Sequence, residues 1–348
     1  MLSKVCVILV NYNNHNDTIE CLESVIKNTY TNYQVVVVDN STTNDSFNYF
    51  REWSLGRVAT IETRFRELVY PLTPPHEHIF VNEEELQAFS ASSVGEDQIL
   101  FVKINKNFGF AHANNKAIAY ALNQYKADFV WLLNNDTVID KEALTNLVLY
   151  ANASVAKTGM WGSKLLLYMA PETIQGVGGK YNKWTGVARE LGYRQKDDGQ
   201  WMPGTFTFDY VIGASMLVSA EFIRETGVME EDYFIYYEEL DWAIRGKRKG
   251  WKLGFCAESK VYHKMGATIH KQNIGGYSHL ADFYSVRNKL LLTRKYFPYA
   301  FVTLYPAFLK FVFNRIRTRQ FSRIAMMLKI MVNPKKHFNA FYKAKKPG

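Results

Sequence analysis

Several segments in the first 150 residues are continuous apolar runs that end in Asn or Asp. They read KVCVILVNYNN from Lys4, YQVVVVDNS from Tyr33 and ADFVWLLNND from Ala127. Apolar runs without polar alternation are typical of parallel strands that are buried on both faces. The run QILFVKIN from Gln98 predicts a further strand of the same sheet.

Amphipathic segments between these runs predict helices over residues 17–27, 113–125 and 141–151. In the first of them, Asp17 is a plausible N-cap with Glu20 three residues later, and Ile19, Leu22 and Ile26 form one apolar face. Strands that alternate with helices at this spacing form βαβ units. The first 150 residues therefore predict a doubly wound α/β domain.

The segment 51–97 does not follow this rhythm and is interpreted as an insertion. It is charged and rich in proline, and its stretch VNEEELQAF predicts one short helix. Further along, glycines and aromatic residues mix around 160–210 and predict loops and short strands beside a cleft. The stretch DYVIGASMLVS predicts another strand, and EELDWAIRGKRKG a helix that ends at Gly250.

The pattern changes after Tyr277. LADFYSVRNKLLLTRKYF predicts a helix, and the residues that follow mix aromatic, aliphatic and basic side chains. The longest uncharged run, Tyr296 to Leu309, has 14 residues and two prolines, fewer than the roughly 20 residues that a membrane-spanning helix needs. Apolar residues interleaved with Arg and Lys favour helices that lie in a membrane interface.

Charge is divided unevenly along the chain. Residues 287–348 contain fifteen Lys and Arg and no Asp or Glu, so the formal net charge of +9 separates into a mildly acidic body and a basic end. Nucleic acid or an anionic membrane could each be the partner of the basic end, but no nucleic-acid-binding signature appears. The three scattered cysteines favour a reducing compartment, and the N-terminus predicts a buried strand rather than a signal peptide.

Polar clusters at the strand ends are the first candidate site. VNYNN, VDNS and NNDT follow predicted strands directly, and NKNFGFAHANN follows closely. One such cluster is usually a turn, but a parallel sheet gathers several along one edge, where α/β folds bind ligands. The sequence has neither a dinucleotide fingerprint nor a Walker A loop. If Asp136 lies close to His263, the two would form a site for Mn²⁺ or Mg²⁺.

The stretch DYFIYYEELDWAIRGKRKGW is the second candidate. On a helix, Glu238, Asp241 and Arg245 share one side and could form a solvated charge ladder. Glu239 falls on a neighbouring face beside Trp242. A carboxylate against aromatic rings and near another carboxylate has a raised pKa, which suits a general base.

Taken in order, these stretches resemble family 2 inverting glycosyltransferases of the GT-A fold, and in particular the rhamnosyltransferase-like branch of bacterial surface polysaccharide synthesis. The resemblance runs from residue 4 to about 297, apart from the insertion, and includes VYHKMGA and YSVRNKLLL. It implies a GT-A domain over residues 1–276, with a nucleotide-binding half over 1–150 and an acceptor and catalytic half over 151–276. Residues 277–348 would be a helical, membrane-associating region.

The resemblance also implies roles for individual residues. Glu239 would be the catalytic base, although the family usually has a Glu-Asp pair where this chain has Glu-Glu. Asp136 and His263 would bind Mg²⁺ or Mn²⁺, and Asn134 stands where many relatives have Asp. The nucleotide-sugar donor would contact Val10, Asn11, Tyr12, Asp39, Asn40, Asn107, Gly109, Asn114, Asn134, Asn135 and Arg287. The acceptor pocket would contain Tyr236, Glu238, Asp241, Trp242 and Trp184.

The implied function is transfer of L-rhamnose from dTDP-rhamnose to a lipid-linked glycan acceptor. This reaction would belong to the synthesis of bacterial O-antigen, capsule or cell-wall polysaccharide. UDP-galactofuranose and other UDP-hexoses are alternative donors. A catalytically inactive member that binds a sugar or acts as a scaffold is the alternative of another class. The implied location is the inner face of the cytoplasmic membrane, bound peripherally through the basic end and without nucleic acid.

Overall fold

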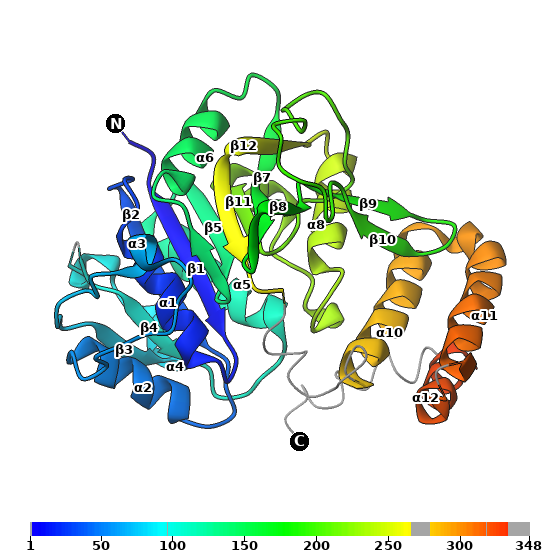
Figure 1. The fold of residues 1–348 in the computed structure, drawn as a ribbon, viewed down its shortest axis with the longest axis horizontal. Coiled ribbons are helices and arrows are strands. Elements are labelled where there is room, and N and C mark those ends of the chain that lie inside the picture. Colours follow the sequence, from blue (N-terminus) through cyan, green and yellow to red (C-terminus); the bar gives the residue numbers. More distant parts are fainter. Residues whose placement is uncertain (1, 96, 266–278, 318, 333–348) are drawn as a thin grey trace.

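The centre of the protein is a large mixed β-sheet with helices on both faces (Figure 1). The computed structural model describes residues 2–95, 97–265, 279–317 and 319–332. Within these residues the main sheet has the strand order β3-β4-β2-β1-β5-β11-β7-β12-β6, and β8 pairs with β7. The strands of its nucleotide-binding half are β1 (Val5–Asn11), β2 (Tyr33–Asp39), β3 (Ile79–Asn82), β4 (Leu100–Lys103) and β5 (Phe129–Asn134).

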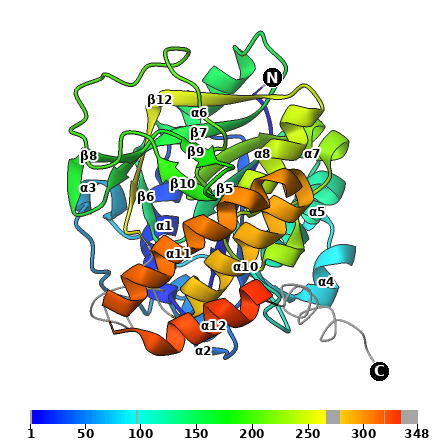
Figure 2. The same cartoon turned by 90° about the vertical axis from the view of Figure 1, so that its right-hand side faces the viewer.

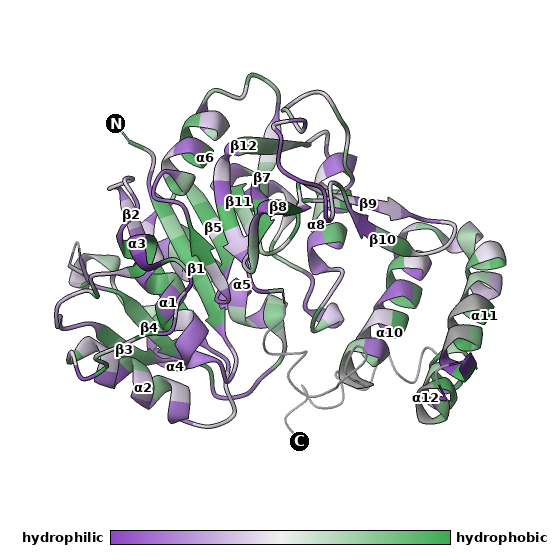
Figure 3. Cartoon of the chain, viewed as in Figure 1, coloured by the Kyte–Doolittle hydropathy of each residue, from purple (hydrophilic) through white to green (hydrophobic). Residues whose placement is uncertain are grey.

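Strands β4, β2, β1 and β5 run parallel, as the apolar runs predicted, and β3, which the sequence did not predict, joins them in the same direction. Their side chains point alternately into two cores, one on each face, and Figure 3 shows these strands as a continuous apolar layer. Helices α1 (His15–Ile26), α2 (Asp45–Ser54) and α6 (Ala143–Asn152) cover one face. Helix α5 (Phe110–Tyr120) covers the other. The predicted α/β fold class is confirmed.

Two helices begin earlier than the sequence indicated. Helix α1 starts at His15, so Asp17 lies in its first turn, where its carboxylate accepts a hydrogen bond from the side chain of Asn14. Helix α5 starts at Phe110 rather than Ala113, because Gly109 turns the chain with a φ of 103°. It passes into a π-helical turn, η2 (Ala121–Tyr125).

The segment 51–97 joins the sheet instead of standing apart from it. Its strand β3 pairs in parallel with β4 at one edge. The predicted short helix is confirmed as α4 (Glu83–Ala88), which begins with a capping box between Asn82 and Glu85. The segment also contains the end of α2, helix α3 (Arg66–Val69) and the 3-10 turn η1 (Ala91–Ser93).

The second half of the sheet is mixed. Strand β11 (Ser215–Ser219) pairs antiparallel with both β5 and β7 (Thr158–Leu167), and β12 (Lys252–His263) runs parallel to β7. Strands β9 (Gly179–Asn182) and β10 (Val187–Glu190) form a separate hairpin. The remaining elements here are β6 (Thr137–Ile139), β8 (Ala170–Gly176), α7 (Ala220–Thr226), η3 (Glu231–Tyr233) and α8 (Glu238–Arg248).

Three helices lie beside this body and are seen face-on in Figure 2. They are α10 (His279–Tyr296), α11 (Phe301–Arg317) and α12 (Phe321–Val332), with the turn η4 (Pro298–Ala300). They share a small apolar core. Leu292 and Tyr296 of α10 also pack into the main core, so α10 joins the two parts that the sequence divided at residue 276.

None of the helices in the described ranges combines the length and the apolar character needed to cross a membrane. The stretch 266–278, with the end of the VYHKMGA motif, lies outside these ranges. So do residues 333–348 of the predicted membrane-associating region.

Candidate active site

The polar residues that end β1 and β2 form a buried hydrogen-bonded cluster. Asn11 and Asp39 are paired in the sheet register, and the Asn11 amide donates to Asp39 at 2.8 Å and to Ser41 at 3.1 Å. The other Asp39 oxygen accepts from Lys103 Nζ at 2.8 Å, and Asp39 is fully buried. The Thr18 hydroxyl donates to the side-chain oxygen Oδ1 of Asn11 at 2.9 Å. These contacts fix the edge of the sheet where a ligand would bind.

The end of β5 adjoins this cluster. The Asn135 amide donates to Thr18 Oγ1 at 2.9 Å, which ties it to the start of α1. The Asn134 amide lies 3.4 Å from His263 Nε2, at the end of β12. The strand ends of β1, β2 and β5 therefore meet as the sequence predicted, although Val10, in the same group of predicted donor residues, is a core residue of β1.

Asp136 and His263 lie in contact. Asp136 Oδ1 is 3.0 Å from His263 Nε2, and His263 Nδ1 is 2.8 Å from Gln175 Oε1. Burial disfavours the charged imidazole, but the Asp136 carboxylate outweighs this effect and raises the pKa of His263. The Gln175 carbonyl accepts the proton of Nδ1, so the Nε2 lone pair is directed toward Asp136 when the ring is neutral.

This pair fits a divalent cation. The described part of the chain has no group of three or more His, Cys, Asp or Glu that could hold a metal. One carboxylate and one imidazole nevertheless suit Mg²⁺ or Mn²⁺ in sites where water and phosphate oxygens complete the coordination. Gln175 would orient the imidazole through its hydrogen bond to Nδ1.

The predicted NFGFAHANN motif lies between the strand ends and the loop before α8. Asn107 accepts a hydrogen bond from the Asn40 amide at 3.0 Å, which places the motif beside the end of β2. The Phe110 amide donates to the Phe234 carbonyl at 2.7 Å. A Cβ at Gly109 would overlap the backbone of Phe234. Glycine is thus required where the motif meets this loop.

Glu238 and Glu239 form the first turn of α8. Burial, opposed by a backbone hydrogen bond and reinforced by the charge of Glu190, raises the pKa of Glu239 to about 7. Burial and the neighbouring Glu239 raise the pKa of Glu238 well above its usual range. Glu238 is thus held as a neutral carboxyl, whereas Glu239 ionises near neutrality, as a general base requires.

Glu190 is linked to His263 through the side chain of Gln175. It is the last residue of β10, and Gln175 Nε2 donates to its carboxylate at 3.3 Å. Burial raises the pKa of Glu190, and the nearby His263 acts against this shift. The charge of Glu190 raises the pKa of both His263 and Glu239.

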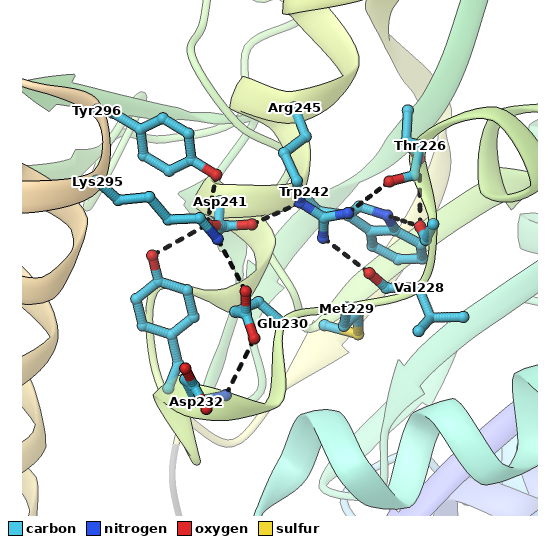
Figure 4. Close-up of polar contacts among 12 residues, drawn as sticks. Thr226, Val228, Met229, Glu230, Asp232, Asp241, Trp242, Arg245, Lys295 and Tyr296 are labelled. Atoms are coloured by element: carbon cyan, nitrogen blue, oxygen red, sulfur yellow. Dashed lines mark hydrogen bonds and ion pairs between the residues drawn. The ribbon is translucent and has the colours of Figure 1, made fainter. Parts of the chain in front are cut away.

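Asp241 and Trp242 lie in the core, in contrast to the acceptor pocket and solvated ladder that the sequence predicted. Asp241 is fully buried and accepts hydrogen bonds from Arg245 at 2.7 Å, Tyr296 at 2.7 Å and Lys295 at 2.9 Å (Figure 4). Trp242 is also fully buried, and its Nε1 donates to the Gly227 carbonyl at 2.8 Å. Neither side chain can reach an acceptor.

Five other predicted residues occupy different surroundings. Trp184 lies in the turn between β9 and β10, and its ring contacts that of Tyr299, near the C-terminal helices. Arg287 is buried, and its guanidinium donates to the Asn288 side chain at 2.8 Å. The Asn114 side-chain amide donates to the Phe110 backbone carbonyl within α5. The side chain of Tyr12 is exposed to solvent. Tyr236 belongs to the loop before α8.

The sequence interpretation gave no role to Gln175, Glu190, Lys103 or Asn288. Gln175 and Glu190 come from the region of mixed glycines and aromatics, where no pattern marks them. Lys103 ends a predicted strand beside Asp39, a position that could have suggested an ion pair. Asn288 follows Arg287 within the YSVRNKLLL motif, so the motif itself was a signal.

The fold is that of GT-A glycosyltransferases. The structure superposes on GalNAc-T7 bound to UDP, GalNAc and Mn²⁺ with a TM-score of 0.54 and 15% identity, over 84% of this chain and 48% of that one. It superposes on the mannosyltransferase PcManGT of Pyrobaculum calidifontis, bound to GDP-Man and Mn²⁺, with a TM-score of 0.51 and 14% identity, over 96% and 87%.

Residues 6–67 match the family model of glycosyl transferase family 2. The chain is 22% identical over 270 residues to the low-salt glycan biosynthesis hexosyltransferase Agl10 of Haloferax volcanii, covering 76% of this chain and 68% of that protein. It is 25% identical over 202 residues to the dTDP-rhamnosyl transferase RfbF of Shigella flexneri, covering 57% and 64%.

Proposed function

We propose that this protein is an inverting glycosyltransferase that moves a sugar from a nucleoside-diphosphate donor to a hydroxyl group of a glycan. The observation that supports the proposal is the contact of Asp136 with His263, together with a carboxylate of raised pKa at Glu239. Glu239 has a pKa near 7. The Asp136–His263 pair is connected through Gln175 to Glu190, whose charge acts on Glu239.

The reaction needs a proton acceptor and an environment that accepts the leaving group. Glu239, ionised, takes the proton of the acceptor hydroxyl as the oxygen attacks the anomeric carbon. The new C–O bond forms on the face opposite the departing diphosphate, which leaves with the electron pair of the broken bond. A divalent cation held by Asp136 and His263 would neutralise the charge of the diphosphate.

We propose dTDP-rhamnose as the donor. The resemblance of the sequence motifs to the rhamnosyltransferase-like branch and the similarity to RfbF over 202 residues support this choice. UDP-galactofuranose and other UDP-hexoses are the alternatives.

A titration of nucleotides distinguishes these donors. We would titrate dTDP, UDP and GDP by calorimetry, with and without Mn²⁺, into the wild-type protein, Asp136→Ala and the control Asp198→Ala, which removes an exposed carboxylate. We expect Mn²⁺-dependent binding of dTDP that is lost only in Asp136→Ala. Selective binding of UDP would replace rhamnose by a UDP-sugar. If no nucleotide binds at millimolar concentration, the protein is not a nucleotide-sugar transferase.

The surface of the C-terminal helices supports a membrane-bound acceptor. On α11, the side chains of Val302, Leu309, Phe313 and Ile316 are exposed at helical spacing and form one apolar stripe. Residues 287–348 carry basic and no acidic side chains. We propose that this surface lies on an anionic membrane, the inner face of the cytoplasmic membrane, where a lipid-linked glycan would be available.

A further inference from the structure

The loop that leads into α8 has an unusual backbone. Phe234, Tyr236 and Tyr237 have φ values of 65°, 69° and 78°, in the left-handed region that residues with a Cβ rarely adopt. Tyr237 is the N-cap residue of α8, and its carbonyl accepts the Asp241 amide at 2.8 Å in the first turn. The position of Glu239 in that turn therefore depends on a conformation that the loop does not favour by itself.

A single buried amide from α10 holds this loop. Asn288 is fully buried, and its Nδ2 lies 2.9 Å from the Tyr233 carbonyl oxygen, 2.7 Å from that of Ile235 and 3.0 Å from that of Tyr236. Its two N–H groups are shared among these three acceptors. The Arg287 guanidinium donates to Asn288 Oδ1 at 2.8 Å and so fixes which side of the amide faces the loop.

The opposite side of the loop is held by the start of α5. The Phe110 amide donates to the Phe234 carbonyl, and the absence of a Cβ at Gly109 allows the two backbones to touch. The loop is thus hydrogen-bonded to α5 on one side and to α10 on the other. The backbone amides of α10 are already used in hydrogen bonds within the helix. The three loop carbonyls that converge on α10 can therefore accept hydrogen bonds only from its side chains.

We propose that Asn288 is the positioning residue for the catalytic base: it holds residues 233–237 so that Glu239 points into the site. This inference rests on the proposed function, because it assigns Asn288 a role through Glu239. Asn288 itself binds neither donor nor acceptor. A displacement of about 1 Å in a reacting group costs about 10²-fold in rate, so loss of the amide lowers turnover without lowering donor affinity.

The test combines Asn288→Asp with Glu239→Gln. Asn288→Asp keeps the size of the side chain and replaces its donors by an acceptor. We would measure hydrolysis of dTDP-rhamnose in the presence of Mn²⁺, and dTDP binding by calorimetry. We expect kcat to fall about 10- to 100-fold in Asn288→Asp, with the Kd for dTDP within about twofold. Added to Glu239→Gln, the substitution should lower kcat by less than about twofold, since the group it positions is already lost.

Two further variants make the result specific. Asn288→Ser retains one hydroxyl donor and should recover part of the activity, and it replaces Asn288→Asp if that variant does not fold. Asn28→Asp is the matched control, because Asn28 is also a buried amide that donates to a backbone carbonyl, that of Val25, at 2.6 Å. Asn28→Asp should retain wild-type kcat.

Several results would overturn the proposal. The first is a wild-type kcat in Asn288→Asp. The second is a double variant whose fold-loss of kcat equals the product of the losses in Asn288→Asp and Glu239→Gln. The third is a loss of dTDP affinity in Asn288→Asp as large as its loss of kcat. If Glu239→Gln alone retains wild-type kcat, the base assignment fails and the proposal for Asn288 fails with it. A loss confined to Asn288→Asp would then mean that the loop positions a different group.

Discussion

Replacing Glu239 by Gln should make the protein less active and, at alkaline pH, more stable. Gln has nearly the same size as Glu but cannot take a proton, so kcat should fall by about 10²–10⁴-fold. The pKa of Glu239 is about 7, against 4.5 for an unperturbed Glu. That difference of about 2.5 units, at about 1.4 kcal/mol per unit, corresponds to at most about 3–4 kcal/mol.

The pH dependence follows from proton binding. Between about pH 4.5 and 7 the folded protein keeps a proton on Glu239 that the unfolded chain has lost. Ionising this carboxyl therefore destabilises the fold, increasingly up to pH 7 and by a constant amount above it. Gln carries no charge at any pH. The stability gain of Glu239→Gln should be near zero at pH 4 and reach its full value by pH 8.

Urea unfolding at pH 5 and pH 8 measures this gain, and donor hydrolysis measures the activity. Glu52→Gln is the control, since Glu52 is exposed, and it should change neither quantity. In the wild type, kcat/KM should rise with pH to a plateau above about 7, because only ionised Glu239 accepts a proton. A stability gain equal at the two pH values would refute the raised pKa, and full activity of the variant would refute the role of Glu239 as base.

Three other substitutions test separate parts of the structure. Gln175→Leu removes the group that orients His263 and should weaken Mn²⁺-dependent nucleotide binding about 10- to 100-fold in calorimetry; unchanged binding would contradict a metal at this pair. Gly109→Ala should displace the loop before α8 and lower kcat about 10²-fold or more, measured by donor hydrolysis, whereas wild-type kcat would show that the loop tolerates movement. The double variant Leu309→Glu/Phe313→Glu should bind anionic vesicles about 100-fold more weakly in a sedimentation assay. The control Leu149→Glu, on the exposed surface of α6, should bind them as the wild type does. Equal vesicle binding of the double variant and the control would exclude α11 from the membrane contact.

The sequence predicted the parallel half of the sheet well. Strands β1, β2 and β5 are buried on both faces, so their sequences are continuous apolar runs. Strand β3 was missed because only four residues of a charged segment pair with β4. Strand β11 was predicted from DYVIGASMLVS, but its antiparallel pairing with β5 and β7 depends on contacts between distant segments, for which no local pattern exists.

The candidate site was predicted in part for the same reason. The sequence analysis made a metal site depend on Asp136 lying close to His263. In the structure, Asp136 Oδ1 is 3.0 Å from His263 Nε2. Asp241 was predicted in the acceptor pocket, with a solvated charge ladder as the alternative, because its spacing to Arg245 indicates an ion pair but not which side of the helix faces the core. The pair exists at 2.7 Å, but it is buried against α10. Asn288 acts on a loop more than fifty residues away, which no periodicity reveals.

The position of α10 limits how the protein can be shortened or recombined. A chain that ended at residue 276 would lack Leu292 and Tyr296 of the main core and the amide that holds the loop before α8. A chain that kept residues up to 297 would retain all three. Exchange of α11 and α12 between related chains should therefore be made at the turn η4, after α10, where a new surface can be attached without disturbing the first turn of α8.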